Sequence, residues 1–329
     1  MAETFTGEHL LSIRNLTKRY GDLVAVNDVS LNIRPGEIFA LLGANGAGKT
    51  TLIGCTTGLI SRFEGEIRVA GYDVKRDYRT ARQLVGLVPQ ELNFDGFFRT
   101  GELLRYQGGY FGAAAGVVRQ RREHLLQSFA LKEKEEANTR RLSGGMKRRL
   151  MICKALMHEP VLLFLDEPTA GVDVELREEL WNYIRGLRNE GTTIVLTTHY
   201  LEEAEQLADR IGIINRGRLL RVDAREDLMR AFGRRWIEVR LSGPAPGALL
   251  DKLKDLRPEQ TAPNRLKITI KEKQTADREE ANSLFALMKA LREEKMTIET
   301  VESGRSRLED IFKEVVKQDY RNGDGRNEP

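Results

Sequence analysis

Four short apolar runs, each followed within two positions by a glycine or a polar residue, are the clearest pattern along the chain. They cover residues 37–42, 84–88, 161–165 and 192–198. Apolar runs of this length are typical of strands that are buried on both faces of a parallel sheet. Ligands of such sheets bind beyond the carboxyl ends of the strands, so we expect the residues after these runs to meet at one edge.

The spacing of apolar residues elsewhere predicts antiparallel strands and helices. Alternation over residues 10–33, with a turn at Tyr20-Gly21-Asp22, predicts two antiparallel strands, and residues 64–73 predict a hairpin. Helical spacing occurs in residues 49–59, 101–131, 142–158 and 174–190. Together these patterns predict an α/β fold class, with an antiparallel β subdomain and a helical subdomain at about residues 91–160.

The pattern changes near residue 234. From there strands and helices alternate in the order β-α-β-α-β-α, which predicts a small α+β domain at residues 233–318 after a first domain at 1–232. No catalytic grouping is visible in the second domain, and dimer contact or regulation is its expected role. Residues 319–329 are polar, with Gly and Asn, and predict a disordered tail.

The loop after the first apolar run carries the strongest chemical signal. It reads Gly43-Ala44-Asn45-Gly46-Ala47-Gly48-Lys49-Thr50-Thr51, the P-loop pattern, between a predicted strand and a predicted helix. Glycines there let backbone N–H groups surround phosphates. Lys49 supplies positive charge to the β- and γ-phosphates, and the Thr50 hydroxyl can bind Mg²⁺. The loop predicts binding of a nucleoside triphosphate without saying which class of NTPase this is.

Polar residues that suit the same chemistry end the other three runs. Gln90 follows the second, the carboxylates Asp166 and Glu167 follow the third, and His199 follows the fourth. Two carboxylates at this edge suit a metal ion or an attacking water. Ser143-Gly144-Gly145 predicts a capped helix start whose free N–H groups can meet an anion.

Composition narrows the function classes. The 329 residues suggest about two domains, and 53 basic against 49 acidic residues leave a net charge of only +4. That excess does not argue for nucleic acid as a partner. No apolar run approaches the ~20 residues of a membrane helix. Cys55 and Cys153 stand far apart in apolar helical contexts, which favours two reduced core residues over a disulfide.

These motifs, in this order, resemble the nucleotide-binding subunit of an ABC transporter over roughly residues 10–232. Residues 43–50 resemble Walker A, Gln90 the Q-loop, residues 142–146 the signature and residues 162–167 Walker B. Residues 170–173 resemble the D-loop, and His199 the switch histidine. The local sequence and the C-terminal domain are most similar to the ATPase subunits of drug, polysaccharide and small-molecule exporters.

The resemblance implies ATP and Mg²⁺ as cofactors and a role for each motif residue. Glu167, with His199 and Gln90, would be catalytic, and Thr50, Gln90 and Asp166 would hold Mg²⁺. Tyr20 would stack on adenine. The nucleotide-binding residues implied are Tyr20, Gly43, Asn45, Gly46, Ala47, Gly48, Lys49, Thr50, Thr51, Ser143, Gly144, Gly145 and Asp173.

The resemblance also implies partners. Two copies would meet head to tail, so that Ser143-Gly144-Gly145 of one caps the ATP of the other. A separate multi-helix permease would carry the cargo, and the resemblance favours export. No nucleic-acid partner is expected. The protein would then lie peripherally on the cytoplasmic face of the membrane. One alternative is a soluble ABC-type ATPase that acts without a permease, for example in nucleic-acid or cluster-assembly processes. Another is a P-loop kinase, although a kinase would not explain the signature or His199.

Two local features leave expectations open. Met146 stands where the family usually has Gln, so a hydrogen bond from that side chain is unavailable while the backbone donors remain. Lys147-Arg148-Arg149 is interpreted as a basic helix face that supports phosphate binding. Phe94, Phe97 and Phe98 follow Gln90 closely and form either a local core or an exposed docking site for the permease.

Overall fold

A computed structural model describes residues 7–91, 96–172, 174–232, 234–271, 276–305 and 308–323. The chain divides into two compact units, Met1–Val222 and Asp223–Pro329. The sequence places the domain boundary at residue 233, whereas the second unit begins ten residues earlier, at Asp223. It includes α8 (Arg225–Phe232), which contacts the C-terminal helix α11 (Leu308–Gly323). Helix α11 includes residues 319–323, for which the sequence predicts disorder, and residues 324–329 lie outside the described residues.

The alternating segments form an antiparallel sheet of strand order β2-β1-β4-β5. Its strands are β1 (Leu11–Tyr20), β2 (Leu23–Ile33), β4 (Glu64–Val69) and β5 (Tyr72–Asp73). Alternate side chains of β1, such as Leu11 and Ile13, are buried, while the intervening ones lie toward solvent. This is the expected pattern for a sheet with one wet face.

The four apolar runs lie in a second sheet of order β10-β9-β3-β8-β7-β6. Its strands are β3 (Ile38–Leu42), β6 (Val85–Val88), β7 (Leu162–Asp166), β8 (Thr193–Thr198), β9 (Arg210–Asn215) and β10 (Arg218–Ala224). Strand β3 pairs in parallel with β8 and β9, and β7 with β6 and β8. The carboxyl ends of these parallel strands therefore meet at one edge.

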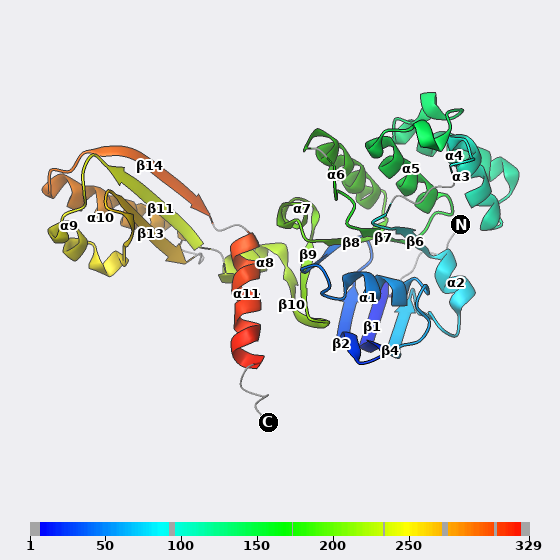
Figure 1. The fold of residues 1–329 in the computed structure, drawn as a ribbon, viewed down its shortest axis with the longest axis horizontal. Helices are drawn as coiled ribbons and strands as arrows, with labels where there is room; N and C mark the ends of the chain where they lie inside the picture. The colour runs from blue at the N-terminus through cyan, green and yellow to red at the C-terminus, as the bar shows by residue number, and fades with distance from the viewer. Residues whose placement is uncertain are drawn as a thin grey trace. The chain divides into compact units, whose positions relative to one another are not determined.

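Helices surround this sheet in the first unit. They are α1 (Lys49–Thr56), α2 (Tyr78–Gln83), α3 (Thr100–Tyr110), α4 (Ala115–Ser128), α5 (Gly144–Leu156), α6 (Val174–Asn189) and α7 (Leu201–Leu207). Helices α3, α4 and α5 contact one another and form the helical part predicted near residues 91–160 (Figure 1). Short 3₁₀ turns at Lys132–Lys134 and Thr139–Arg141 connect α4 to α5.

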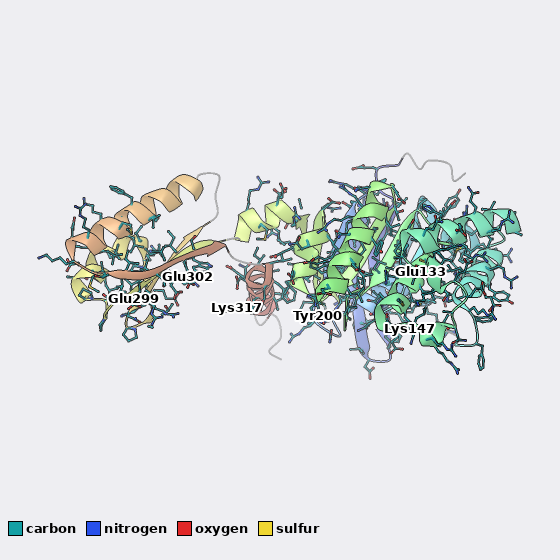
Figure 2. All side chains as sticks on the ribbon, turned by 90° about the horizontal axis from the view of Figure 1, so that it is seen from above. Glu133, Lys147, Tyr200, Glu299, Glu302 and Lys317 are labelled. Atoms are coloured by element: carbon teal, nitrogen blue, oxygen red, sulfur yellow. The ribbon has the colours of Figure 1, made fainter. Side chains whose placement is uncertain are left out.

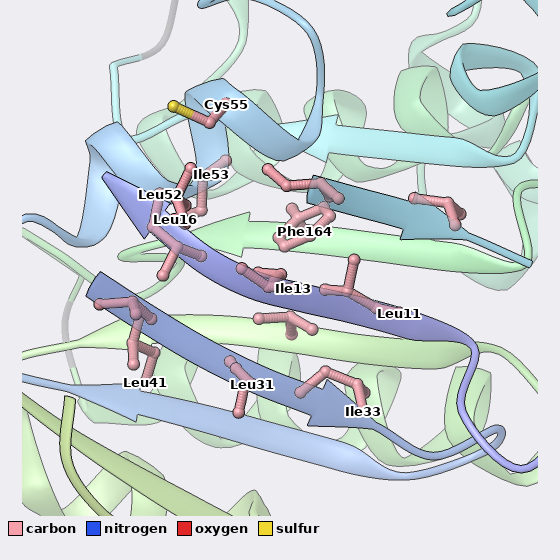
Figure 3. Close-up of a cluster of buried hydrophobic side chains, with 14 of the residues drawn as sticks. Leu11, Ile13, Leu16, Leu31, Ile33, Leu41, Leu52, Ile53, Cys55 and Phe164 are labelled. Carbon is pink, nitrogen blue, oxygen red and sulfur yellow. The ribbon is translucent and has the colours of Figure 1, made fainter. Parts of the chain in front are cut away.

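One hydrophobic core joins the antiparallel sheet, α1 and the parallel sheet (Figure 3). Leu11 and Ile13 of β1, Leu52 of α1 and Phe164 of β7 are all at most 1% exposed. Burial of such side chains contributes about 1.5–3 kcal/mol each. The core thus fixes the first helix, and with it the P-loop, against both sheets.

The second unit has a core of its own. Its antiparallel sheet has the order β12-β13-β11-β14. The elements are β11 (Arg234–Leu241), α9 (Gly247–Lys252), a 3₁₀ turn (Lys254–Leu256), β12 (Glu259–Ala262), β13 (Arg265–Lys271), α10 (Ala276–Glu293) and β14 (Ile298–Arg305). Buried side chains of β11, β13, α9 and α10 pack together, and Glu299 and Glu302 lie on β14 (Figure 2). The α/β fold class with an added α+β unit is confirmed, although β12 was not predicted.

Candidate functional site

The P-loop connects the end of β3 to the start of α1, and its glycines are required by its geometry. Gly48 has φ 104° and Gly46 φ 79°, in the left-handed region that favours glycine. A Cβ atom on Gly48 would lie 2.5 Å from the Ala25 carbonyl oxygen, and one on Gly43 would lie 2.5 Å from that of Ile214. The backbone can therefore follow this path only without side chains at these positions.

Lys49 points back into the loop that it follows. Its Nζ donates to the carbonyl oxygens of Gly43 at 2.7 Å and Ala44 at 3.1 Å, and lies 3.6 Å from Glu167 Oε1. Burial lowers the pKa of Lys49, and the nearby Glu167 and Asp166 carboxylates oppose that effect. The Lys49 side chain is only 5% exposed, so its positive charge is largely desolvated at the loop.

Asp166 joins the end of β7 to the start of α1. The Thr50 hydroxyl donates to its Oδ2 at 3.0 Å, and the Thr197 hydroxyl of β8 donates to its Oδ1. A hydroxyl and a carboxylate side by side are the hard oxygen ligands that Mg²⁺ prefers. The residues present therefore fit the metal ion that the sequence implies.

Glu167 stands at the centre of the strand ends. Gln90 Nε2 donates to its Oε2 at 2.9 Å, and His199 Nδ1 lies 3.2 Å from the same oxygen without hydrogen-bond geometry. Its backbone N–H donates to the Thr197 carbonyl at 3.0 Å, and its own φ is 49°. A non-glycine residue in the left-handed region is strained, and such strain is typical of functional sites.

A cavity of about 570 Å³ opens in front of these residues, a size that suits a small-molecule ligand. It is lined by Tyr20, Leu23, Val24, Ala25, Asn45, Gly46, Ala47, Gly48, Lys49, Thr50, Thr51, Gln90, Glu167, Arg216 and Gly217. Tyr20 is 47% exposed at the rim, and the Lys18 ammonium lies 4.5 Å from its ring centre. The lining thus combines an aromatic ring with the P-loop.

Five residues of this lining were missed from the sequence, namely Leu23, Val24, Ala25, Arg216 and Gly217. The last two lie farthest along the chain from the P-loop. They form the turn between β9 and β10, where the Gly217 N–H donates to the Ala47 carbonyl at 3.0 Å. Gly217 Cα also lies 3.5 Å from where a Cβ on Gly48 would be. The turn itself is visible in the sequence, but its contact with the P-loop depends on β9 lying beside β3.

Some predicted site residues do not line the cavity. Asp166 and His199 contact the lining residues without lining the cavity, and Gly43 contributes its carbonyl to Lys49. Ser143, Gly144 and Gly145 are also absent from the lining. Asp173 lies outside the described residues.

The predicted helix start at Ser143 is present. Ser143 caps α5, because its hydroxyl oxygen accepts from the Met146 N–H at 3.3 Å. Ser143 and Gly144 are exposed, whereas Gly145 is buried, and a Cβ on it would lie 2.0 Å from Leu176 Cδ2 of α6. The end of α5 at Ser143 and Gly144 is therefore exposed and does not line the cavity of its own chain.

The basic run after the signature does not form one solvated face. Lys147 is half-buried on α5 (Figure 2). Arg148 is 3% exposed, and its guanidinium donates to the carbonyls of Pro89 and Gln90, both at 3.1 Å. Arg149 donates to the Phe129 carbonyl at 3.2 Å. The interpretation as a phosphate-supporting face is wrong for Arg148, which instead joins α5 to the backbone that carries the Gln90 side chain.

Comparison with known proteins agrees with this geometry. Residues 26–170 match the family model described as ABC transporter. The Nod factor export ATP-binding protein I of Burkholderia orbicola is 43% identical over 244 residues, covering 74% of this chain and 80% of that protein. The linearmycin resistance ATP-binding protein of Bacillus subtilis is 38% identical over 224 residues, covering 68% of this chain and 72% of that protein.

Solved structures are similar in the same region. An ATP-binding subunit of an ABC transporter shares 30% sequence identity at a TM-score of 0.63, covering 68% of this chain and 93% of that one. The fold and the site therefore define a P-loop ATPase of the ATP-binding cassette class. More specifically, this chain belongs to the family of ATP-binding subunits of ABC transporters, and it has export-type relatives.

In the part of the chain that the structure describes, no helix is long and apolar enough to cross a bilayer.

Proposed function

We propose that this chain hydrolyses ATP as a dimer and thereby drives a separate membrane permease that exports its cargo. The observation that carries the proposal is the grouping of Lys49, Gln90 and His199 around the Glu167 carboxylate at the mouth of a nucleotide-sized cavity. The names of the relatives, which concern Nod factor export and linearmycin resistance, support the outward direction.

The chemistry follows from what each side chain offers. The triphosphate enters the P-loop, where its negative charge replaces Glu167 as the partner of the Lys49 ammonium. Glu167 is then free to accept a hydrogen bond from the attacking water and orient it toward the γ-phosphate. Gln90 and His199, which lie beside Glu167 here, hold that water and the γ-phosphate in place. Mg²⁺, held by Thr50, Asp166 and Gln90, would neutralise charge on the β- and γ-phosphates.

A second copy completes the site. The exposed end of α5, at Ser143 and Gly144, does not face the cavity of its own chain. A helix start of this kind attracts anions through its free N–H groups and its dipole. In a head-to-tail dimer it would meet the γ-phosphate held by the other P-loop, so that ATP joins the two chains and hydrolysis releases them.

The permease is proposed to dock beside Gln90. Phe97 is 81% exposed there, whereas Phe98 is half-buried and packs 5.0 Å from the Tyr106 ring. The structure thus divides the aromatic cluster into one exposed ring and one packed ring, while Phe94 lies outside the described residues. A signal that starts at Phe97 would reach the catalytic site through Gln90, which bonds to Glu167.

The test is the Glu167→Gln variant of the full chain. It keeps the shape of the side chain but removes the carboxylate that orients water, so turnover should fall by about 10²–10⁴-fold, while ATP still binds and the dimer accumulates. Light scattering with ATP should report twice the monomer mass. Lys49→Ala, which cannot hold the triphosphate, is the control and should remain monomeric.

Two outcomes would contradict the proposal. Full turnover in Glu167→Gln would remove this residue from the mechanism, and a monomeric, ATP-loaded Glu167→Gln would remove the dimer. Purification of the chain from membranes tests whether it works with a permease or without one. A co-purifying multi-helix protein supports the permease, and its absence from active preparations supports an ATPase that works without one.

A further inference from the structure

A carboxyl group that the proposed mechanism does not use is completely buried next to the site. Glu203, in the first turn of α7, is 0% exposed. Among the described residues, neither of its side-chain oxygens has a partner in full hydrogen-bond geometry. An isolated buried carboxyl is costly, so its presence here calls for a physical explanation.

Three polar side chains from different elements face this carboxyl. The Thr198 and Thr169 hydroxyls and the Trp181 indole N–H interact with it and lower its pKa, but burial has the larger effect and raises it. These three residues are themselves at most 6% exposed. Thr169 Oγ1 and Trp181 Nε1 also lack a fully formed bond within the described part of the chain. The Thr198 hydroxyl, by contrast, donates to the Tyr200 carbonyl at 3.3 Å, so its oxygen can still accept a hydrogen bond from a protonated Glu203 carboxyl.

The two threonines belong to the loops that carry Glu167 and His199. Thr169 follows Glu167 by two positions, in a turn where the Ala170 N–H donates to the Glu167 carbonyl at 3.2 Å. Thr198 directly precedes His199, and its hydroxyl oxygen accepts from the Tyr200 N–H at 2.9 Å. A single carboxyl therefore lies in contact with both loops, behind the residues that face the cavity.

The charges around Glu203 come from α5 and α6. Arg177 of α6 acts to lower the pKa of Glu203. Burial lowers the pKa of Arg148 on α5, and the charge of Glu203 opposes that effect. Arg177 also lies 3.5 Å from the exposed Glu202 carboxylate. Burial outweighs these charges and raises the pKa of Glu203, which makes uptake of a proton easier here than in a free Glu side chain. A neutral carboxyl both donates and accepts hydrogen bonds, which makes Gln its closest substitute.

We propose that Glu203 is a positioning residue that joins the turn after Glu167 to the end of β8, and so fixes Glu167 and His199 relative to each other. It acts through Thr169 and Thr198, and it does not touch the nucleotide. This inference rests on the proposed function, because the residues that Glu203 positions are those of the proposed site. Hydrolysis would then require Glu203 as well, although this residue does not line the cavity.

The test compares two substitutions in the full-length chain. Glu203→Ala removes the link and should lower kcat at least about tenfold, with the Kd for ATP within about twofold of wild type. Glu203→Gln preserves the neutral hydrogen-bonding shape and should keep kcat within about threefold. Glu202→Ala, on the exposed side of the same helical turn, is the matched control and should behave as wild type.

A double substitution distinguishes a link from two separate effects. Thr169→Val should also lower kcat, and adding it to Glu203→Ala should lower kcat no further, because both changes break the same contact. Losses that multiply would overturn the proposal. So would an unchanged kcat in Glu203→Ala, or a loss in Glu203→Gln as large as that in Glu203→Ala.

Hydrogen exchange gives a readout that does not depend on turnover. Glu203→Ala should speed amide exchange in residues 167–172 and in residues 198–201 together, while Glu203→Gln and Glu202→Ala should not. Unchanged exchange in both segments would refute the link even in an inactive preparation. An inactive wild type, or turnover that survives Glu167→Gln, would instead refute the proposed function. If Glu203→Ala does not fold, Thr169→Val and Glu203→Gln decide the question.

Discussion

Single residues in the site are held by contacts that motif positions do not reveal. Lys49 and Glu167 lie 3.6 Å apart and are both at most 5% exposed, so each supplies the counter-charge of the other. Breaking a buried pair leaves an uncompensated charge. In the proposed mechanism, a phosphate would bring its own negative charge and so replace Glu167 as the partner of Lys49.

His158 shows how burial of one side chain makes stability depend on pH. Its Nε2 lies 3.0 Å from the Val85 carbonyl, and its ring stacks on Phe111 at 3.8 Å. Burial lowers the pKa of His158 below its usual 6.5, with a smaller contribution from Arg121, although the Val85 carbonyl opposes the shift. The folded protein therefore prefers the neutral ring.

We expect His158 to destabilise the protein in acid. Above pH 6.5 the ring is neutral in both states, so its contribution is complete. As pH falls below 6.5, the unfolded chain takes up a proton first, and stability decreases until the folded pKa is passed. Thermal unfolding at pH 7.5 and 5.5 checks this. The drop in Tm should be smaller in His158→Asn than in wild type.

The exposed His124 on α4 supplies the control for this measurement. His124→Asn should show the same drop in Tm as wild type between the two pH values. A drop of equal size in wild type and His158→Asn would show that the buried imidazole does not cause the pH dependence.

At the scale of elements, the start of α5 contains two adjacent glycines with different surroundings. A Cβ on Gly144 would meet nothing within 4 Å, whereas one on Gly145 would meet Leu176 Cδ2 at 2.0 Å. The first glycine leaves space at an exposed helix end, and the second allows α5 to pack against α6. Substitutions at these two glycines can therefore test the exposed helix end and the packing of α5 against α6 separately.

Alanine at each position should give opposite results. Gly144→Ala should keep or raise stability, because Ala favours a helix by up to about 1 kcal/mol. It should nevertheless weaken ATP-driven dimerisation, because a methyl group enters the proposed contact with the second ATP. Gly145→Ala should lower the free energy of unfolding by about 1–3 kcal/mol through overpacking.

Chemical denaturation and light scattering of the two variants, each in the Glu167→Gln background, check this prediction. Dimerisation of Gly144→Ala at the unchanged ATP concentration would contradict the role assigned to the exposed end of α5. Equal stability of the two variants would contradict the packing role assigned to Gly145.

The sequence predicted the elements that build the P-loop side of the site because their patterns are local. Buried parallel strands such as Ile38–Leu42 and Leu162–Asp166 are continuous apolar runs, and the polar residues after them lie at the same sheet edge. The P-loop and its helix follow one of these runs directly. Their sequence positions therefore sufficed to bring Lys49, Gln90, Asp166 and Glu167 together.

Features that depend on strand order or on long-range contacts were not predictable. Arg216 reaches the cavity only because β9 pairs with β3, more than 160 residues away in the chain. The buried role of Arg148 depends on α5 lying beside the Pro89 backbone. The strand Glu259–Ala262 is short and polar at an edge of its sheet, so its sequence lacks the alternation that marks the neighbouring strands.

At the scale of the whole molecule, the cavity belongs to one unit, whereas each unit has a hydrophobic core of its own. Every described residue that lines the cavity precedes residue 218 and lies in Met1–Val222. Asp223–Pro329 has its own buried cluster, which includes Ile237, Leu266 and Leu287. Two units with separate cores can unfold in separate transitions, and a ligand stabilises only the unit that binds it.

We therefore expect ATP to shift one unfolding transition and leave the other in place. In the Glu167→Gln variant, ATP at 100 times its Kd should stabilise the first unit by about 2.7 kcal/mol and raise its Tm, while the transition of the second unit stays unchanged. Differential scanning calorimetry with and without ATP measures both. Adding Lys49→Ala should abolish the shift. A single transition that moves as a whole with ATP would show instead that the C-terminal unit unfolds with the nucleotide site, and hence that it is coupled to ATP binding.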